Sequence, residues 1–338
     1  MKILLTCDPE IPVPPGLYGG IERIVEGLIH AFVQKGHTVT LCANAASKVP
    51  CRLVAWQGLK SQNAVDTVRN MITLTALVTQ EKFDIIHSFS RLAYMLPVMP
   101  FHIPKLMSYQ REPSLSQISK AVKLSKKSSL RFTGCSDYIT NKIKTKAVAD
   151  TIYNFISTDK YDFKEKTDED APLVFLGRIE EIKGTHIAIE AAKKTNKRLI
   201  IAGNVPDTKR DYFEEKIKPN LTERIVYIGT VNDRQKNEIL GKASALLMPV
   251  QWNEPFGIVM AEAMACGTPV LGFPYGAIPE IIQDGVNGFI CENADEMAEK
   301  VSIISKIERK KVREIAEEKF SDKTIPDQYL ALYAAMIK

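Results

Sequence analysis

The sequence has few residues of the kinds that build metal centres or disulfide frameworks. Its 338 residues include six cysteines and five histidines. No Cys-x-x-Cys, His-x-His or His-Glu-x-x-His pattern occurs, and the cysteines stand far apart, mostly within apolar strand or helix patterns. We therefore expect no bound metal ion. Scattered cysteines without a disulfide-like cluster also predict reduced thiols, as in a cytoplasmic protein.

Long apolar stretches are missing too. No run of 18 apolar residues occurs, so the sequence predicts no membrane-spanning helix. The chain opens on an apolar strand pattern at residues 2–6 rather than on a signal sequence, which leads us to expect a cytoplasmic location. A hydrophobic share of 45% in a chain of this length is enough for two domain cores.

Short apolar runs alternate with amphipathic helical patterns along the whole chain. This alternation predicts an α/β protein with parallel sheets covered on both faces. The polar segment 157–171 interrupts the pattern, so we expect two Rossmann-like domains, 1–156 and 172–327, a linker between them and a terminal helix at 328–338. The expected strands are 2–6, 38–43, 83–88, 105–109, 131–135 and 151–154, then 173–177, 198–202, 225–228, 244–248, 269–272 and 288–291.

The segment from Glu254 to Glu262 follows a strand pattern, turns through Gly257 and opens a helix. The first amides of a helix lack intrahelical partners and carry partial positive charge. The backbone N–H groups of Phe256, Gly257 and Ile258 therefore suit a phosphate or a sugar oxygen. Glu262 can accept hydrogen bonds from two ribose hydroxyls, and Glu254 can do the same for a hexose. The alternative is an ordinary strand, loop and helix with two surface acids.

A second segment, from Gly177 to Gly184, contains two basic residues and lies between a strand pattern and a helical pattern. A guanidinium and an ammonium at the carboxyl end of a strand stabilise the negative charge that develops on a departing diphosphate. Arg178 and Lys183 suit this role. The alternative is a solvated loop with scattered charge.

Two features of the first half point to ligand contacts at strand ends. Gly19 and Gly20 precede a helical pattern and predict a second amide-rich helix start, although a simple turn is the alternative. With Gly16 they do not form the dinucleotide fingerprint. His87 lies near the carboxyl end of the strand 83–88, where ligands of open α/β sheets gather, so its ring can donate to a sugar hydroxyl. Alternatively, a backbone carbonyl satisfies the ring.

Together these segments resemble the retaining GT-B glycosyltransferases of family 4, the glycosyl transferases group 1. In that family two glutamates with seven residues between them face a nucleotide-sugar donor, and this spacing fits Glu254 and Glu262. An arginine and a lysine five positions apart contact the donor phosphates, which fits Arg178 and Lys183. The resemblance also implies donor contacts from Gly19, Gly20, Gly203, Val231, Phe256, Gly257 and Ile258, and a sugar contact from His87.

The resemblance implies a GT-B architecture, in which two Rossmann-like domains have parallel sheets that face each other across a cleft. The carboxyl-terminal domain would bind the donor, the amino-terminal domain would bind the acceptor, and the helix 328–338 would pack back on the amino-terminal domain. The implied reaction moves a hexose from a nucleoside-diphosphate sugar, for which UDP-glucose is the family-weighted choice, to a hydroxyl of a saccharide or lipid-linked acceptor. Such enzymes serve polysaccharide or glycolipid biosynthesis. No cofactor is implied, because the nucleotide sugar is a substrate.

Two other functions share parts of this pattern. A sugar-nucleotide epimerase of the same fold needs additional acid and base residues that are not evident here. A catalytically silent nucleotide- or carbohydrate-binding partner would have no need of Arg178, Lys183, Glu254 and Glu262 together. Asp168-Glu-Asp170 has the letters of the metal-binding motif of another glycosyltransferase fold. It lies in the polar connector, and we interpret it as solvated charge.

A basic stretch covers residues 116–131. It contains Lys120, Lys123, Lys126, Lys127 and Arg131, interleaved with apolar residues and without an acid. This pattern predicts a basic helix that touches an anionic membrane or guides a negatively charged acceptor, at about 1 kcal/mol per basic residue near the membrane. The alternative is a solvated helix face. No aromatic interleaving supports a nucleic-acid partner.

Overall fold

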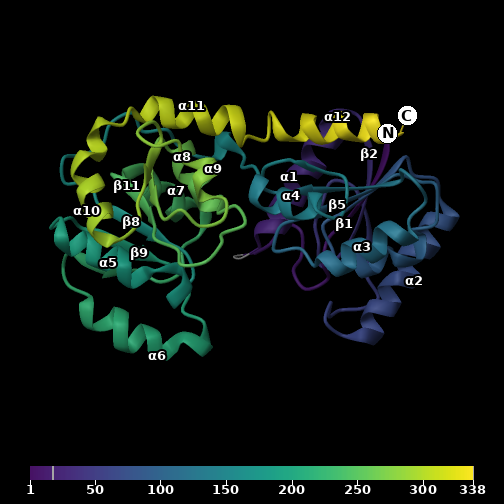
Figure 1. Cartoon of the computed structure of the whole chain (residues 1–338), viewed down its shortest axis with the longest axis horizontal. Helices are drawn as coiled ribbons and strands as arrows, with labels where there is room; N and C mark the ends of the chain where they lie inside the picture. The colour runs from purple at the N-terminus through teal and green to yellow at the C-terminus, as the bar shows by residue number, and fades with distance from the viewer. Residues whose placement is uncertain (17–18, 338) are drawn as a thin grey trace. The chain divides into compact units, whose positions relative to one another are not determined.

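A computed structural model describes residues 1–16 and 19–337 of the chain. The chain forms two compact units (Figure 1). The first unit comprises Met1–Phe155 and Asp322–Lys338, and the second comprises Ile156–Ser321. Each unit is a parallel sheet with helices packed against it, as the alternation of strand and helix patterns predicts.

The sheet of the first unit has the strand order β3-β2-β1-β4-β5-β6-β7, and all its pairs are parallel. Its strands are β1 (Lys2–Thr6), β2 (Thr38–Ala43), β3 (Arg52–Ala55), β4 (Ile85–Ser88), β5 (Lys105–Tyr109), β6 (Leu130–Gly134) and β7 (Ala149–Thr151). Its helices are α1 (Gly20–Gln34), α2 (Ala64–Gln80), the 3₁₀ helix η1 (Leu92–Val98), α3 (Leu115–Leu124), α4 (Asp137–Lys144) and α12 (Ile325–Ile337).

The sheet of the second unit repeats this plan with the order β10-β9-β8-β11-β12-β13. Its strands are β8 (Leu173–Leu176), β9 (Leu199–Ala202), β10 (Ile225–Tyr227), β11 (Ala245–Met248), β12 (Val270–Gly272) and β13 (Gly288–Ile290). Its α-helices are α5 (Thr185–Lys194), α6 (Arg210–Tyr212), α7 (Asp233–Lys242), α8 (Ile258–Ala265), α9 (Ile278–Ile281), α10 (Ala294–Ile303) and α11 (Arg309–Lys319). Shorter helical turns are η2 (Thr158–Lys160), η3 (Glu181–Lys183), η4 (Asp207–Lys209), η5 (Phe213–Ile217), η6 (Lys218–Asn220) and η7 (Ile304–Lys306).

Both strand orders are those of the doubly wound Rossmann fold. In such sheets the order reverses next to the first strand, and ligands bind outside the carboxyl ends of the strands at that switch point. The switch points lie between β1 and β4 in the first unit and between β8 and β11 in the second. The predicted α/β fold with two Rossmann-like sheets is therefore confirmed, and each sheet has a defined place for a ligand.

Burial explains why these segments form strands and helices. Ile3, Leu4 and Leu5 of β1 are all fully buried, which is typical of a central parallel strand covered on both faces. In α1, Ile24, Leu28 and Phe32 recur every four residues, and each is at most 1% exposed. This spacing gives the helix one apolar face, which packs against the sheet.

The structure refines the expected boundaries. The polar segment 157–171 belongs to the second unit, where η2 lies in it, rather than standing apart as a linker. The terminal helix begins at Ile325 instead of residue 328, and α12 belongs to the first unit. Its Tyr333 ring lies 5.7 Å from the ring of Phe32 in α1. Lys338, at the end of the expected helix, lies outside the described residues.

Every expected strand has a counterpart with ends within three residues, but the sequence analysis did not predict β3. This strand has four residues at the edge of the sheet. Arg52 is exposed, and the other three are only half-buried. The basic stretch 116–131 is likewise not one helix, because α3 ends at Leu124 and Arg131 lies in β6, 2.7 Å from Asp150.

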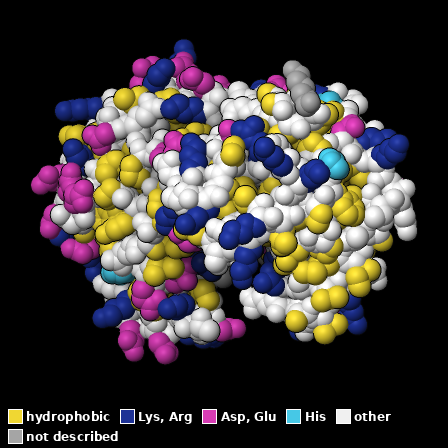
Figure 2. Space-filling model, turned by 45° about the vertical axis from the view of Figure 1, so that its right-hand side comes forward, with side chains coloured by type: hydrophobic (Ala, Val, Ile, Leu, Met, Phe, Trp, Pro, Cys, Tyr) yellow, Lys and Arg dark blue, Asp and Glu magenta, His cyan; other side chains and the backbone are white. Residues whose placement is uncertain are grey.

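The surface carries both basic and apolar side chains, which adjoin on the face shown in Figure 2. Lys120, Lys123, Lys126 and Lys127 are exposed on and just after α3. Among the described residues, no helix is both long and apolar enough to span a bilayer.

Candidate active site

Four of the predicted residues follow adjacent strands of the second sheet. Arg178 and Lys183 lie in the segment after β8, Gly203 follows β9, and Glu254 follows β11. Because β9, β8 and β11 are neighbours, their carboxyl ends share one edge of the sheet at the switch point. The segments also contact one another, since Gln251 N–H donates to the carbonyl of Ile182 at 2.7 Å.

Lys183 and Glu254 are in direct contact. The Lys183 Nζ lies 2.6 Å from Glu254 Oε2, and the two side chains are 17% and 11% exposed. The indole N–H of Trp252 donates to the same oxygen at 3.1 Å, and the Lys183 ammonium lies 4.7 Å from the centre of the Trp252 ring. Two donors and a cation–π contact therefore hold a partly buried ion pair in one geometry.

The helix start after Glu254 has the form that the sequence predicts. Gly257 adopts φ 76° immediately before α8, a conformation that favours glycine. A Cβ there would lie 2.8 Å from Met260 Cε and 3.3 Å from Glu254 Cγ. Ile258 opens the helix, and the Phe256 ring packs on Phe320 at 5.6 Å. The turn thus places the first amides of α8 beside the Glu254 side chain, where an anionic group would be stabilised.

Arg178 is the more exposed of the two predicted cations. Its side chain is 41% exposed, and Nη2 lies 2.8 Å from Oε1 of the buried Glu180. Its exposed face leaves the guanidinium accessible to a phosphate, while Glu180 keeps it at the strand end. Arg178 is therefore the more accessible cation at the strand end, whereas Lys183 is more buried and contacts Glu254 and Trp252.

Gly203 and Val231 border the same edge of the sheet. Gly203 adopts φ 150°, and a Cβ there would lie 1.8 Å from the carbonyl oxygen of Gly177. Only glycine permits this close approach of the β8 and β9 ends. Val231, for which the resemblance implies a donor contact, is half-buried just before α7. That role stays a prediction.

Glu262 lies in the second turn of α8, and its side chain is 4% exposed. Its Oε1 accepts a hydrogen bond from the Tyr161 hydroxyl at 2.8 Å and a second from the Lys236 ammonium. Burial, and next the charge of Glu262, raises the pKa of Tyr161 well above its usual value, so the hydroxyl stays protonated and donates. Glu262 is therefore a fixed carboxylate, not a surface acid.

In the first unit, Gly19 and Gly20 lie after β1, at the start of α1. Gly19 has φ 153°, and a Cβ there would lie 2.6 Å from Pro15 and 2.8 Å from Glu22 Oε2. Around Gly20 a Cβ would meet no atom within 4 Å. The backbone conformation at Gly19 thus requires glycine, whereas Gly20 leaves open space at the start of α1.

The structure corrects the expectation for His87. Its ring is fully buried, and both nitrogens are bonded within the first unit. Nε2 lies 2.6 Å from the Ser108 hydroxyl, and Nδ1 is bonded to the hydroxyl of Tyr333 in α12. Burial lowers the pKa of His87 to about 3, so the ring is neutral. The ring joins α12 to the sheet and has no exposed atom for a sugar hydroxyl. Two side-chain hydroxyls satisfy it, instead of the backbone carbonyl considered as the alternative.

Both units match known families of glycosyltransferases. Residues 157–321 match the family described as glycosyl transferases group 1, and residues 18–160 match the one described as glycosyltransferase family 4. The chain belongs to the group 1 glycosyltransferases. It is thus an enzyme of the class that transfers a sugar from a nucleotide-sugar donor.

Known relatives resemble this glycosyltransferase over most of its length. An uncharacterized glycosyltransferase of Methanocaldococcus jannaschii is 26% identical, and the match covers 81% of this chain and 82% of that protein. AviGT4, a glycosyltransferase involved in avilamycin A biosynthesis, has a TM-score of 0.77 and 22% identity over 99% of this chain and 98% of that one. Anabaena HepE in complex with UDP and glucose has a TM-score of 0.74 and 20% identity over 99% and 100%. Both structures share the GT-B fold.

The sequence analysis missed three residues that contact predicted site residues. Trp252 contacts Lys183 and Glu254, while Tyr161 and Lys236 contact Glu262. Lys236 did leave a signal, because it lies four residues before the buried Leu240 and therefore on the buried face of α7. Nothing in the sequence links Tyr161, in the polar segment 157–171, to a helix a hundred residues away.

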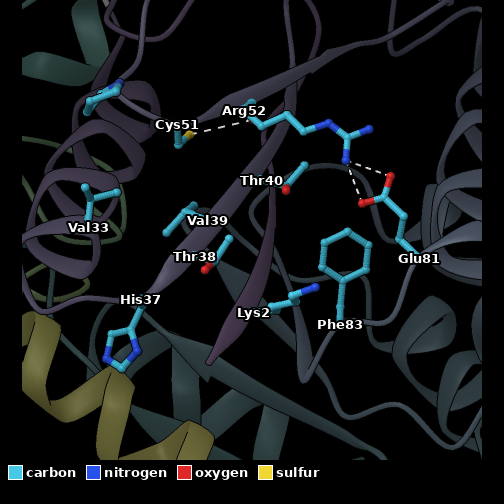
Figure 3. A pocket seen from close by; sticks show the side chains of 11 residues that line it. Lys2, Val33, His37, Thr38, Val39, Thr40, Cys51, Arg52, Glu81 and Phe83 are labelled. Carbon is cyan, nitrogen blue, oxygen red and sulfur yellow. Dashed lines mark hydrogen bonds and ion pairs between the residues drawn. The ribbon is translucent and has the colours of Figure 1, made fainter.

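A pocket of about 340 Å³ lies elsewhere in the first unit (Figure 3). Its lining includes Lys2, Thr38 and Arg52, the first residues of β1, β2 and β3. It therefore opens at the amino ends of the strands, opposite the edge where ligands of such sheets bind. Arg52 is paired with Glu81 at 2.6 Å, and none of the predicted site residues lines this pocket.

Proposed function

We propose that this glycosyltransferase moves a hexose from a nucleoside-diphosphate sugar to a hydroxyl of a saccharide or lipid-linked saccharide acceptor, with retention at the anomeric carbon. The second unit binds the donor, and the first unit binds the acceptor. The observation that carries the proposal is the contact of Lys183 with Glu254 at the β8/β11 switch point, beside the start of α8. An ammonium, helix amides and a sugar-binding carboxylate there suit a sugar diphosphate.

In the proposed reaction, the bond between the anomeric carbon and the diphosphate oxygen breaks, and a bond from the acceptor oxygen forms on the same face. The acceptor's proton passes to a phosphate oxygen of the donor, which leaves as the nucleoside diphosphate. No side chain needs to be a strong base. Lys183 and Arg178 stabilise the charge on the leaving group in place of a metal ion, and Glu254 orients the hexose.

Support for a uridine donor comes from the complex of HepE with UDP and glucose, which has a similar fold. The acceptor class and a role in polysaccharide or glycolipid biosynthesis rest on the family resemblance. We infer a cytoplasmic location from the six cysteines, which stand far apart in the sequence.

A thermal-shift panel with UDP, ADP and GDP tests donor binding. A ligand at about 100 times its dissociation constant stabilises the folded state by roughly 2.7 kcal/mol, so we expect the correct nucleotide to raise the melting temperature by several degrees. The shift should persist in EDTA. If no nucleoside diphosphate shifts the transition, the proposed function is wrong.

We also propose that the first unit touches an anionic membrane through residues 116–131. Lys120, Lys123, Lys126 and Lys127 are exposed, and Leu124 beside them is 54% exposed. Helix α2, which like α3 packs against η1, has three further exposed apolar side chains, Val65, Val68 and Ile72. Basic and apolar groups on one face are typical of helices that lie on a membrane.

Vesicle co-sedimentation tests this contact. Replacing the four lysines on and after α3 by glutamine should weaken binding to vesicles rich in phosphatidylglycerol at least tenfold, at about 1 kcal/mol lost per lysine. The matched control replaces Lys193, Lys194, Lys216 and Lys218 of the second unit. Equal losses in both variants, or equal binding to uncharged vesicles, would contradict a specific surface.

A further inference from the structure

Among the described residues, hydrogen-bond donors reach one of the two oxygens of the Glu262 carboxylate. Oε1 accepts from both the Tyr161 hydroxyl and the Lys236 ammonium. For Oε2 the structure records no hydrogen-bond partner among the described residues. A carboxylate oxygen has lone pairs for two hydrogen bonds, so Oε2 keeps its full capacity for a ligand.

The two donors reach Glu262 from separate parts of the second unit. Tyr161 follows η2, and its carbonyl accepts a hydrogen bond from Arg313 of α11 at 2.9 Å. Lys236 lies in α7, which begins with a capping box at Asn232. Its side chain is only 11% exposed. Both donors are thus held by their own elements and do not depend on a ligand for their position.

Two donors on one oxygen fix the plane of the carboxylate. Ordering a long acidic side chain costs conformational entropy, which a ligand would otherwise have to overcome on binding. In this site the Glu262 side chain is already ordered in the folded protein before a ligand binds. The ammonium also neutralises a charge that would be costly to bury alone.

We propose that Tyr161 and Lys236 are positioning residues for the donor nucleotide. They hold Glu262 with Oε2 directed to accept hydrogen bonds from the ribose hydroxyls. This inference rests on the proposed function, because it takes Glu262 as the ribose-binding residue. A purely structural network would stabilise the fold and leave ribose recognition unchanged.

The test measures dissociation constants by titration calorimetry for UDP, ADP and GDP, each beside its 2′,3′-dideoxy analogue. The ratio within one protein reports the contribution of the ribose hydroxyls and cancels general losses of stability. For the wild type we expect the nucleotide with hydroxyls to bind about tenfold or more tightly, as for hydrogen bonds to a charged group. In Tyr161→Phe and Lys236→Met the ratio should fall to about threefold or less.

The matched control is Tyr212→Phe, which removes another buried tyrosine hydroxyl of the second unit, one bonded to His186 at 2.8 Å. It should keep the wild-type ratio. Tyr161→Phe removes a single oxygen, so it offers a folded variant even where Lys236→Met does not fold. A wild-type ratio in Tyr161→Phe would overturn the inference while leaving the proposed function intact. Failure of the wild type to bind any of the nucleotides would overturn both.

Discussion

Lys183→Ala is expected to lower the rate of sugar transfer by about 100-fold to 1,000-fold. The ammonium is the fixed cation of the site, held 2.6 Å from Glu254 and over the Trp252 ring, so it meets the leaving diphosphate without reorganisation. Removing one preorganised donor from a developing anion typically costs this much. The measurement is the release of nucleoside diphosphate with donor and acceptor present.

The same substitution should cost little stability. Glu254 keeps its hydrogen bond from Trp252, so we expect a loss of about 1–2 kcal/mol in the free energy of unfolding. Lys194→Ala is the matched control, because it removes an exposed, ion-paired lysine from the same unit. Its turnover should equal that of the wild type. Undiminished turnover in Lys183→Ala would reject the role assigned to this residue.

His87→Gln is expected to destabilise the first unit by about 2–4 kcal/mol at neutral pH. The substitution removes a fully buried ring and disturbs its bonds to Ser108 and Tyr333, which join α12 to the sheet. Of the two tryptophans, Trp56 belongs to the first unit and Trp252 to the second. Urea unfolding followed by Trp56 fluorescence in a Trp252→Phe background therefore reports the first unit.

His87 also predicts a pH dependence. Burial lowers the pKa of His87 from 6.5 to about 3. Below pH 6.5 the ring is therefore protonated in the unfolded chain and still neutral in the folded protein. The contribution of this pKa shift to the free energy of unfolding is fully present above pH 6.5. It is lost as the pH falls toward 3, at about 1.4 kcal/mol per pH unit.

Between pH 7 and pH 5 the wild type should therefore lose about 2 kcal/mol more than His87→Gln. The exposed His102 provides the control, and His102→Gln should behave as the wild type does. Parallel pH profiles for His87→Gln and the wild type would show that the ring does not stay neutral in the folded state.

Much of the fold could be predicted from the sequence because its signals are local. A buried run such as Lys2–Thr6, followed by a helix with apolar residues every four positions, specifies a strand and a covering helix without distant information. The four-residue edge strand β3 gave no such signal. The end of the second domain was not predicted correctly either. Residues 322–327 belong to the first unit, and the contacts that place them there join segments far apart in the sequence.

The site shows the same limit. Spacing and strand-end position located Lys183 and Glu254, which the structure brings into contact. Position at a strand end also predicted that His87 contacts a sugar, and this prediction was wrong. Tyr333 of α12, 246 residues later, covers the ring. Tyr161 was missed for the matching reason, since its partner Glu262 is 101 residues away. Strand ends therefore mark candidates, and long-range contacts decide which of them a ligand can reach.

A crystal structure of the enzyme with a bound nucleoside diphosphate tests the central claim most directly. The account predicts a diphosphate at the start of α8, within hydrogen-bonding distance of Lys183 Nζ and the Arg178 guanidinium, with the ribose on Glu262. A nucleotide bound elsewhere, or one whose phosphates touch neither Lys183 nor Arg178, would contradict it.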